Sequence, residues 1–388
     1  MVSSTAVGSL AARAVFYMST HSSFKSEATY DADTVAAVQA LQGWYNQGTG
    51  LWDTTGWWNS ANCLTVLADY AVANPDSAAS LDIPNIIQNT FSQAQKTSFQ
   101  AIKTFNAAGL PVSSYARIPK GAIADRGFDD FLNDYYDDEG WWALALIRTH
   151  DIGNYGLDDS KFLDAAVNIF EDMKAGNSPC GGIYWSKVDD YTNAIANELY
   201  LKVAASLANR IPDKKDYYLD IAQSQWSWFK QSGMINGDNL INDGLGDDCK
   251  SNGQNTWTYN QGVILGALVE LARASGDNSL LDEASTIATA AITHLSKDGV
   301  LYEGCEPDCG ADGAQFKGVF MRNLRELQQA APQDAFKNFL LKNADSIWAN
   351  DRNDNNQLGV TWTGPYTDAD AGGHSSAMDA LVAALVVA

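Results

Sequence analysis

The chain has 388 residues, of which 46% are hydrophobic, and it contains 12 tryptophans. This composition is typical of a folded protein with a large core and excludes an intrinsically disordered chain. The formal net charge of −22 disfavours nucleic acids and anionic membranes, which would repel the chain, and suits a neutral ligand. No run of about 20 apolar residues occurs, so we expect no membrane-spanning helix.

Residues 1–29 are interpreted as an N-terminal extension that contains part of a signal segment. Residues 7–18 are small and apolar, but they lack a charged start and a long apolar core. From residue 30 to residue 388 no proline- or serine-rich linker divides the chain. We therefore predict one catalytic domain over 30–388, and we expect it to be a monomer.

Six amphipathic segments with one polar face predict helices on the outside of a fold. In chain order they are 33–45, 83–105, 161–174, 217–231, 280–295 and 334–350. The segments between them are richer in Ala, Gly and Leu, which predicts buried inner helices. These are 59–73, 138–151, 193–209, 260–275, 317–330 and 374–387. Outer and inner helices that alternate six times predict an all-α fold, the (α/α)6 barrel.

A glycine, followed closely by an aliphatic and then an aromatic residue, recurs after the outer helices. It is found at Gly50, Gly182, Gly299 and Gly359. We expect each glycine to have a positive φ and to lead through a short extended piece into the next inner helix. Every inner helix then begins on the same face of the barrel. Polar and aromatic side chains from six helix starts should form a groove there.

The motif YYDDEGWW at 135–142 places three acids between four aromatic residues, at the start of a predicted inner helix. The helix macrodipole alone would explain the acids, with Glu139 in that role, but it does not explain the aromatics. Glycoside hydrolysis requires a pair of carboxylates, one as an acid and one as a nucleophile or base. The Cα atoms of Asp137 and Asp138 are about 3.8 Å apart. This adjacency favours the short carboxylate separation of retaining enzymes, although side-chain rotamers can widen it.

Other helix starts supply candidates for sugar binding. Amides would hydrogen-bond sugar hydroxyls, with helix capping as the alternative role for Asn. Aromatic rings would stack on sugar rings, with burial in the core as the alternative. For the lysine the alternative is a salt bridge. The candidate substrate-binding residues are Trp57, Trp58, Asn59, Trp185, Asn193, Asn197, Trp257, Tyr259, Asn260, Gln261 and Lys317.

Six segments, in order, resemble glycoside hydrolase family 76, the endo-α-1,6-mannanases. They are DDEGWWALA (137–145), CGGIYW (180–185), NAIANEL (193–199), TYNQG (258–262), FKGVFMR (316–322) and WTGP (362–365). The resemblance covers roughly residues 40–385. It implies an (α/α)6 fold, retention of configuration and no metal or other cofactor. It also implies that Asp137 is the nucleophile and Asp138 the general acid/base. The loop CEPDC at 305–309 is similar to that of secreted fungal members.

The chain has five cysteines. Cys305 and Cys309 lie close together in one loop, and Cys180 and Cys249 lie in two others. We predict these two pairs as disulfides, with Cys63 left free in a helix. No cysteine or histidine spacing is typical of a zinc site. Disulfides form in oxidising compartments, so we expect a secreted, extracellular protein.

The predicted function is endo-acting hydrolysis of α-1,6-linkages in mannan or manno-oligosaccharides. One alternative is a transglycosylase of the same family that acts on cell-wall or GPI-linked mannan. Another is a glycan-binding toroid without catalytic activity. The intact pair of Asp137 and Asp138 argues against the last, because binding alone does not require two carboxylates that repel each other.

Overall fold

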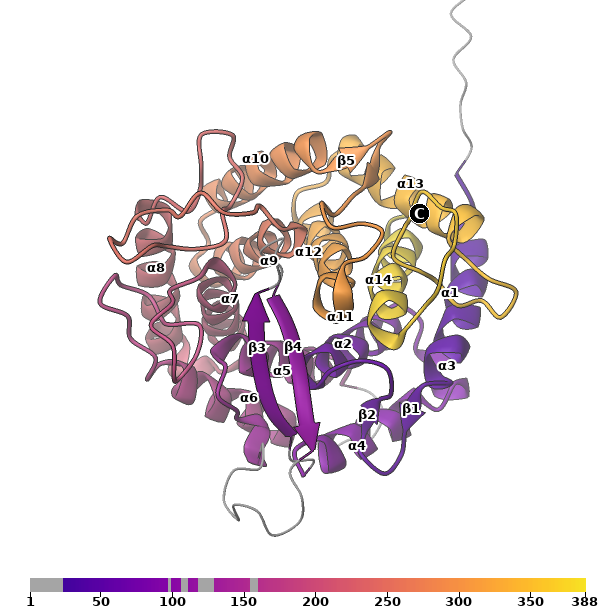
Figure 1. Ribbon diagram of the computed structural model, residues 1–388, viewed down its shortest axis with the longest axis horizontal. Coiled ribbons are helices and arrows are strands. Elements are labelled where there is room, and N and C mark those ends of the chain that lie inside the picture. Colours follow the sequence, from indigo (N-terminus) through magenta and orange to yellow (C-terminus); the bar gives the residue numbers. More distant parts are fainter. Residues whose placement is uncertain (1–23, 97–98, 106–110, 118–128, 154–159) are drawn as a thin grey trace, which may run out of the picture.

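The computed structural model describes residues 24–96, 99–105, 111–117, 129–153 and 160–388. Its centre is a closed ring of inner helices, seen end-on in Figure 1. Around the ring they are α2 (Trp57–Ala73), α5 (Tyr136–His150), α7 (Ala194–Arg210), α9 (Thr258–Ser275), α12 (Phe316–Ala330) and α14 (Ala371–Val387). Each of these helices packs against the next, and α14 closes the ring by packing against α2. The predicted (α/α)6 barrel is confirmed.

A second set of helices surrounds the ring (Figure 1). It consists of α1 (Glu27–Gln42), α4 (Ile83–Ala94), α6 (Ser160–Met173), α8 (Lys215–Gln231), α10 (Ser279–His294) and α13 (Asp334–Asn350). Helix α6 shows why these helices lie outside. Its buried residues, Phe162, Ala166, Ile169, Phe170 and Met173, recur at helical spacing along one stripe. By contrast, all but the last two residues of inner helix α14 are buried. The six inner helices begin within three residues of their predicted starts.

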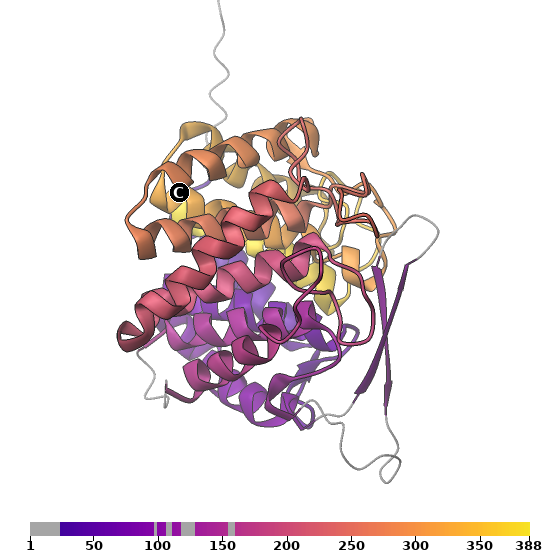
Figure 2. The same ribbon diagram turned by 90° about the vertical axis from the view of Figure 1, so that its left-hand side faces the viewer.

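The predicted outer helix 83–105 is wrong beyond Ala94, where α4 ends. Residues Phe99–Phe105 form strand β3, which pairs antiparallel with β4 (Pro111–Arg117), with Lys103 opposite Ser113. The segment contains aromatic and β-branched residues that favour strands, and the partner strand supplies its backbone hydrogen bonds. The hairpin crosses one open end of the helix ring, as both the end-on view and the side view show (Figures 1 and 2).

Short connections lead from outer to inner helices. Strands β1 (Tyr45–Asn46) and β2 (Leu51–Trp52) form a hairpin after α1, and β5 (Ser296–Lys297) and β6 (Val300–Leu301) form one after α10. The expected positive φ is found at Gly50, Gly182 and Gly299. It is absent at Gly359, where the reason for glycine is close packing. A Cβ atom there would lie 2.5 Å from Oδ1 of Asp351.

Two disulfides join Cys180 to Cys249 and Cys305 to Cys309, and Cys63 is free and buried, as predicted. Helix α3 (Pro75–Ser80) and helix α11 (Gly310–Gly313) are short additions to the barrel, and α11 follows the second disulfide directly. None of the helices in the described ranges is both long and apolar enough to cross a bilayer. Residues 1–23, most of the predicted N-terminal extension, lie outside the described residues, so the division at residue 30 stays a prediction.

Candidate active site

The starts of the inner helices surround a small cavity at the end of the ring that the β3–β4 hairpin crosses. Its volume is about 20 Å³, which is room for about one water molecule. The cavity is lined by Trp58, Lys103, Asp137, Trp141, Trp185, Asn193, Asp243, Tyr259, Asp312 and Phe316. These residues come from the starts of α2, α5, α9 and α12, from the short helix α11, from strand β3 and from the loops before the helices. Helix starts that converge on one face therefore bring together residues far apart in the sequence.

The two aspartates of the DDEG motif occupy the first turn of α5, where the helix dipole stabilises negative charge. The indole Nε1 of Trp185 donates a hydrogen bond to Oδ2 of Asp137 at 2.9 Å. The amide Nδ2 of Asn133 donates one to Oδ2 of Asp138 at 2.8 Å. Each carboxylate thus has its own neutral donor, which fixes its orientation.

The ammonium group of Lys103 lies between the two carboxylates. Its Nζ is 2.9 Å from Oδ2 of Asp137 and 2.6 Å from Oδ1 of Asp138. Because both oxygens contact one nitrogen, they can be no farther apart than these two distances end to end, about 5.5 Å. Retaining glycosidases have carboxyl groups about 5–5.5 Å apart, and inverting enzymes about 6.5–9.5 Å. The arrangement fits the retaining geometry.

The acids of the site differ in their environments. Asp138 is fully buried, and this burial raises its pKa to about 7; Asp137 adds to the increase, and Lys103 opposes it. Across the cavity, burial raises the pKa of Asp243 to about 6, with Asp137 adding to it and a hydrogen bond from Tyr191 opposing it. A carboxyl group with a pKa near neutrality can donate a proton to a leaving group. Asp138 has that property.

Aromatic rings form one wall of the cavity. The rings of Trp58 and Trp141 stack with centroids 5.6 Å apart, and Trp141 stacks on Tyr259 at 6.4 Å. Tyr259 in turn stacks on Phe316 at 3.9 Å. This row of rings spans α2, α5, α9 and α12. Such a surface suits the apolar C–H faces of sugars and leaves the carboxylates as the charged part of the site.

A larger, more open cavity of about 600 Å³ adjoins the small one. Lys103 and Trp185 line both cavities, so these two side chains separate them. The open cavity is also lined by Tyr184 and Tyr191, by the disulfide-bonded Cys180, and by the acidic side chains of Asp189, Asp190 and Asp247. No group of three or more His, Cys, Asp or Glu residues within the described part of the chain could hold a metal ion.

Among the predicted substrate-binding residues, Trp58, Trp185, Asn193 and Tyr259 lie on the cavity wall. The others take different positions. Trp57 is 1% exposed, packs against Trp142, and donates from Nε1 to the carbonyl of Ala94. Asn59 is buried and donates to the side chain of Gln315, which joins α2 to the start of α12. Both residues hold helices together and do not line the cavity.

Two predicted amides fasten loops instead of lining the cavity. Asn197 accepts a hydrogen bond from the backbone N–H of Ile183 and donates to its carbonyl, each at 2.8 Å. Gln261 does the same with Ile241, at 2.8 and 2.9 Å. In both cases an inner-helix amide satisfies the backbone of the loop that precedes the helix. These loops carry Trp185 and Asp243, so the amides support the site indirectly.

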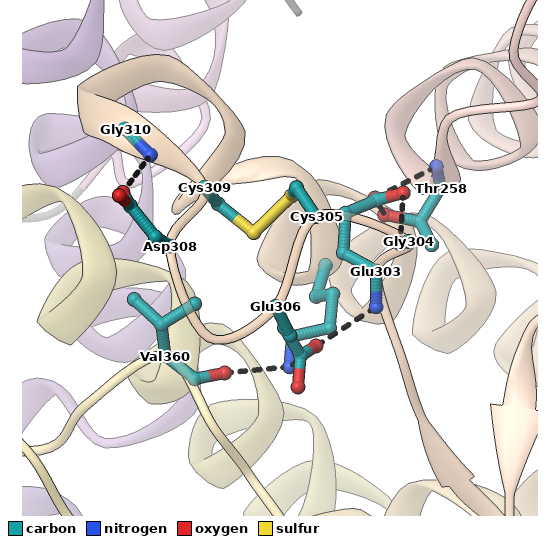
Figure 3. The surroundings of a disulfide bond; sticks show 10 residues. Thr258, Glu303, Gly304, Cys305, Glu306, Asp308, Cys309, Gly310 and Val360 are labelled. Atoms are coloured by element: carbon teal, nitrogen blue, oxygen red, sulfur yellow. Dashed lines mark hydrogen bonds and ion pairs between the residues drawn. A yellow bond between two sulfur atoms is a disulfide. The ribbon is translucent and has the colours of Figure 1, made fainter. Parts of the chain in front are cut away.

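The last three predicted residues also lie off the cavity wall. Trp257 precedes α9 and packs against Phe316 with ring centroids 5.9 Å apart. Asn260 is fully buried, and its side chain has no hydrogen-bond partner among the described residues. Lys317 is 1% exposed and binds Glu306 at 2.5 Å and the carbonyl of Val360 at 2.7 Å. Figure 3 shows Glu306 and Val360 beside the Cys305–Cys309 disulfide.

Five residues of the cavity wall were not predicted as site residues, namely Lys103, Trp141, Asp243, Asp312 and Phe316. Lys103 lies in a segment that was expected to be helical. Asp243 and Asp312 lie more than 100 residues beyond the DDEG motif, in stretches without a distinctive pattern. Trp141 belongs to the motif itself. Its position four residues after Asp137, one helical turn later on the same face, is a signal that could have identified it.

Near Lys317, the side chain of Asp351 makes the stability of the fold sensitive to pH. It is fully buried, and neither oxygen has a hydrogen-bond partner among the described residues. Burial raises the pKa of Asp351 to about 8; Glu306 and Asp368 add to this, and Lys317 opposes it. Between pH 4 and pH 8 the folded state keeps a proton that the unfolded state releases. The free energy of unfolding should therefore fall as the pH rises through this window.

We expect Asp351→Asn to be more stable than the wild type at pH 8, by on the order of 1–3 kcal/mol, and to differ little from it at pH 4.5. Melting temperatures of both proteins at the two pH values test this expectation. The exposed Asp354→Asn is the matched control, which should keep the wild-type pH dependence. Equal slopes of melting temperature against pH for wild type and Asp351→Asn would contradict it.

The ring of helices with paired carboxylates and an aromatic wall at one end defines a carbohydrate-active (α/α)6 protein. Residues 26–388 match Glycosyl hydrolase family 76. The chain belongs to this family.

The chain is similar to a putative mannan endo-1,6-α-mannosidase of Schizosaccharomyces pombe, with 28% identity over 213 residues. That match covers 50% of this chain and 48% of the relative, so the chain spans about half the length of the curated relatives it matches. An α-1,6-mannanase of Salegentibacter sp. HEL1_6 has a similar structure, with a TM-score of 0.76 at 20% identity. The match covers 92% of this chain and 100% of the Salegentibacter chain.

The structure of Dfg5 of Chaetomium thermophilum, solved in complex with glucosamine, is also similar, with a TM-score of 0.75 at 18% identity. The match covers 95% of this chain and 92% of the Dfg5 chain. The Salegentibacter protein was also solved as an inactive variant, in which two consecutive aspartates are replaced by asparagine, in complex with α-1,6-mannotriose. At these identities the likeness shows a shared fold.

Proposed function

We propose that the protein is an endo-acting α-1,6-mannosidase that cleaves mannan with retention of configuration. The observation that carries this proposal is the carboxylate pair at the start of α5, held about 5.5 Å apart or less beside a row of aromatic rings. Membership of family 76 and the names of the curated relatives support the substrate. The Salegentibacter variant further supports the role of adjacent aspartates, because that inactive protein has two of them replaced.

In the proposed mechanism Asp138 is protonated and donates its proton to the glycosidic oxygen as the bond to the anomeric carbon breaks. Asp137 attacks that carbon and forms a covalent glycosyl-enzyme. Asp138, now ionised, removes a proton from water, which attacks the same carbon and releases Asp137. Two inversions give net retention. The hydrogen bond from Trp185 holds the nucleophilic oxygen of Asp137 in position through both steps.

We further propose that the protein works outside the cell. The two disulfides require an oxidising compartment. Both lie near the site: Cys180 lines the open cavity, and the Cys305–Cys309 loop precedes Asp312 of the small cavity. The net charge of −22 fits a neutral polysaccharide as substrate.

A timed digestion of linear α-1,6-mannan tests the proposal, with products separated by size and the configuration of the new reducing end followed by proton NMR. We expect manno-oligosaccharides of intermediate length early in the reaction, with α-configured ends first. A β-configured first product would refute retention. Products longer than a supplied oligosaccharide would indicate transglycosylation, and binding without cleavage would indicate a glycan-binding toroid.

A further inference from the structure

The β3–β4 hairpin holds a lysine in the catalytic centre, in contact with both carboxylates. The Nζ atom of Lys103 is 2.9 Å from each oxygen of Asp137 and 2.6 Å from Oδ1 of Asp138. Its side chain is only 3% exposed. It also lies over the rings of Tyr135 and Trp185, 4.7 and 5.3 Å from their centroids. The ammonium group is thus enclosed by acids and aromatic faces.

The hairpin is fastened to the barrel at two further points. The backbone N–H of Lys103 donates to the hydroxyl of Tyr135 at 3.2 Å. On the opposite strand, the backbone N–H of Ser113 donates to Oδ2 of Asp312 at 2.6 Å, and Nε1 of Trp58 donates to the other oxygen of Asp312. Lys103 and Ser113 face each other in the hairpin. Both strands are therefore anchored on the rim of the cavity, as their course across the ring suggests (Figure 1).

With Lys103 in place, the centre cannot perform the proposed reaction. The remaining space of about 20 Å³ holds about one water molecule, far less than a sugar ring needs. The ammonium group also stabilises Asp138 in its charged form, whereas the first step requires Asp138 to be protonated. Burial alone would lower the pKa of Lys103, but Asp137 and Asp138 outweigh it and raise that pKa, so the lysine stays charged.

The ammonium group of Lys103 lies where positive charge develops on the sugar in the transition state of the proposed reaction. A glycosidase transition state carries positive charge near the anomeric carbon, between the nucleophile and the acid. The Nζ atom supplies a positive charge in the same place. Lys103 also separates the small catalytic cavity from the open cavity of about 600 Å³. If its side chain leaves, the two cavities become one cleft that leads to Asp137.

We propose that the β3–β4 hairpin is an inhibitory plug, in which Lys103 occupies the sugar-binding position between Asp137 and Asp138 and must be displaced before substrate is cleaved. The proposal rests on the proposed function for the identity of the substrate. The contact itself does not depend on which glycan is cleaved.

The first test is kinetic. Lys103→Ala removes both the charge and the volume, and we expect it to raise kcat/KM for α-1,6-mannotetraose at least five-fold. Lys103→Met keeps most of the volume and should give a smaller increase. Lys297→Ala, which changes an exposed side chain on strand β5, is the matched control and should leave the rate unchanged. Where the wild type cleaves this substrate, a kcat/KM for Lys103→Ala that is equal to or below that of the wild type, at an unchanged melting temperature, would overturn the plug, and a lower kcat would show a direct role of Lys103 in catalysis.

The second test does not use a substrate. Native wild-type protein is treated with an amine-acetylating reagent at pH 8.5, and acetylation at each lysine is followed by peptide mass spectrometry. We expect Lys103 to react at least ten-fold more slowly than Lys297. In the double variant Asp137→Asn/Asp138→Asn it should react several-fold faster than in the wild type. Equal rates at Lys103 and Lys297 in the wild type would overturn the plug.

The two tests separate the two proposals. If no variant cleaves mannan but Lys103 is protected as expected, the proposed substrate is wrong and the plug stands. If the wild type cleaves mannan and Lys103 reacts freely, the proposed function stands and the plug is wrong.

Discussion

Asp137→Asn is expected to abolish cleavage of α-1,6-mannan, with kcat reduced on the order of 10⁴-fold or more, because an amide at this position cannot form the glycosyl-enzyme. The amide keeps the shape of the carboxylate and can still accept the hydrogen bond that Trp185 donates to it. We therefore expect an intact fold, checked by the melting temperature. Mannan cleavage at more than one per cent of the wild-type rate would contradict the assignment of Asp137 as the nucleophile.

Asp138→Asn should lose activity through a different step from Asp137→Asn, and the comparison of the two variants tests which aspartate has which role. Loss of the general acid should cost about 10²–10⁴-fold on mannan, whose leaving oxygen needs a proton. With a nitrophenyl manno-oligosaccharide the leaving group departs without protonation, so glycosyl-enzyme should form and accumulate. Azide, which attacks without a general base, should then restore turnover of Asp138→Asn but not of Asp137→Asn. Identical behaviour of the two variants would show that the roles are assigned incorrectly.

The inner helices could be predicted because their signal is local. A helix that is apolar around its whole circumference must be buried, which identifies the inner helices. The segments that resemble the family lie at or shortly before the starts of these helices. The positions of Asp137, Trp185 and Tyr259 on one face follow once six helices alternate. The hairpin could not be predicted in this way. Its position depends on contacts of Lys103 with Asp137 and Asp138, and of Ser113 with Asp312, which no pattern within residues 83–117 reveals.

The roles of the amides also could not be separated by sequence. An amide that binds a sugar hydroxyl and an amide that binds a backbone N–H and C=O need the same donor and acceptor. Asn197 and Gln261 each satisfy both backbone groups of one loop residue. Asn193, by contrast, lies on the cavity wall and also caps α7. Which role an amide takes depends on whether a loop leaves backbone groups unpaired beside it.

Arg325→Met is expected to destabilise the fold by about 3 kcal/mol, because the buried Asp69 then loses one of its two arginine partners and keeps only the partly exposed Arg148. Asp69 on α2 is 2% exposed, and its Oδ1 atom binds Arg325 of α12 at 2.9 Å and Nε of Arg148 of α5 at 2.5 Å. Burial raises the pKa of Asp69, but the two arginines outweigh it and hold that pKa below its usual range. This cluster joins three inner helices near their carboxyl ends, away from the catalytic cavity.

Calorimetry at pH 7 should show a melting temperature for Arg325→Met that is lower by about 4 °C. The exposed pair Lys230–Glu283, at 3.2 Å, offers the matched control, since Lys230→Met should cost at most about 1 kcal/mol. Adding Asp69→Asn to Arg325→Met should recover part of the loss, because the buried carboxylate charge that Arg148 alone then compensates is removed. If Arg325→Met and Lys230→Met melt at the same temperature, the buried cluster does not hold the ring together, and the apolar contacts between the inner helices alone stabilise it.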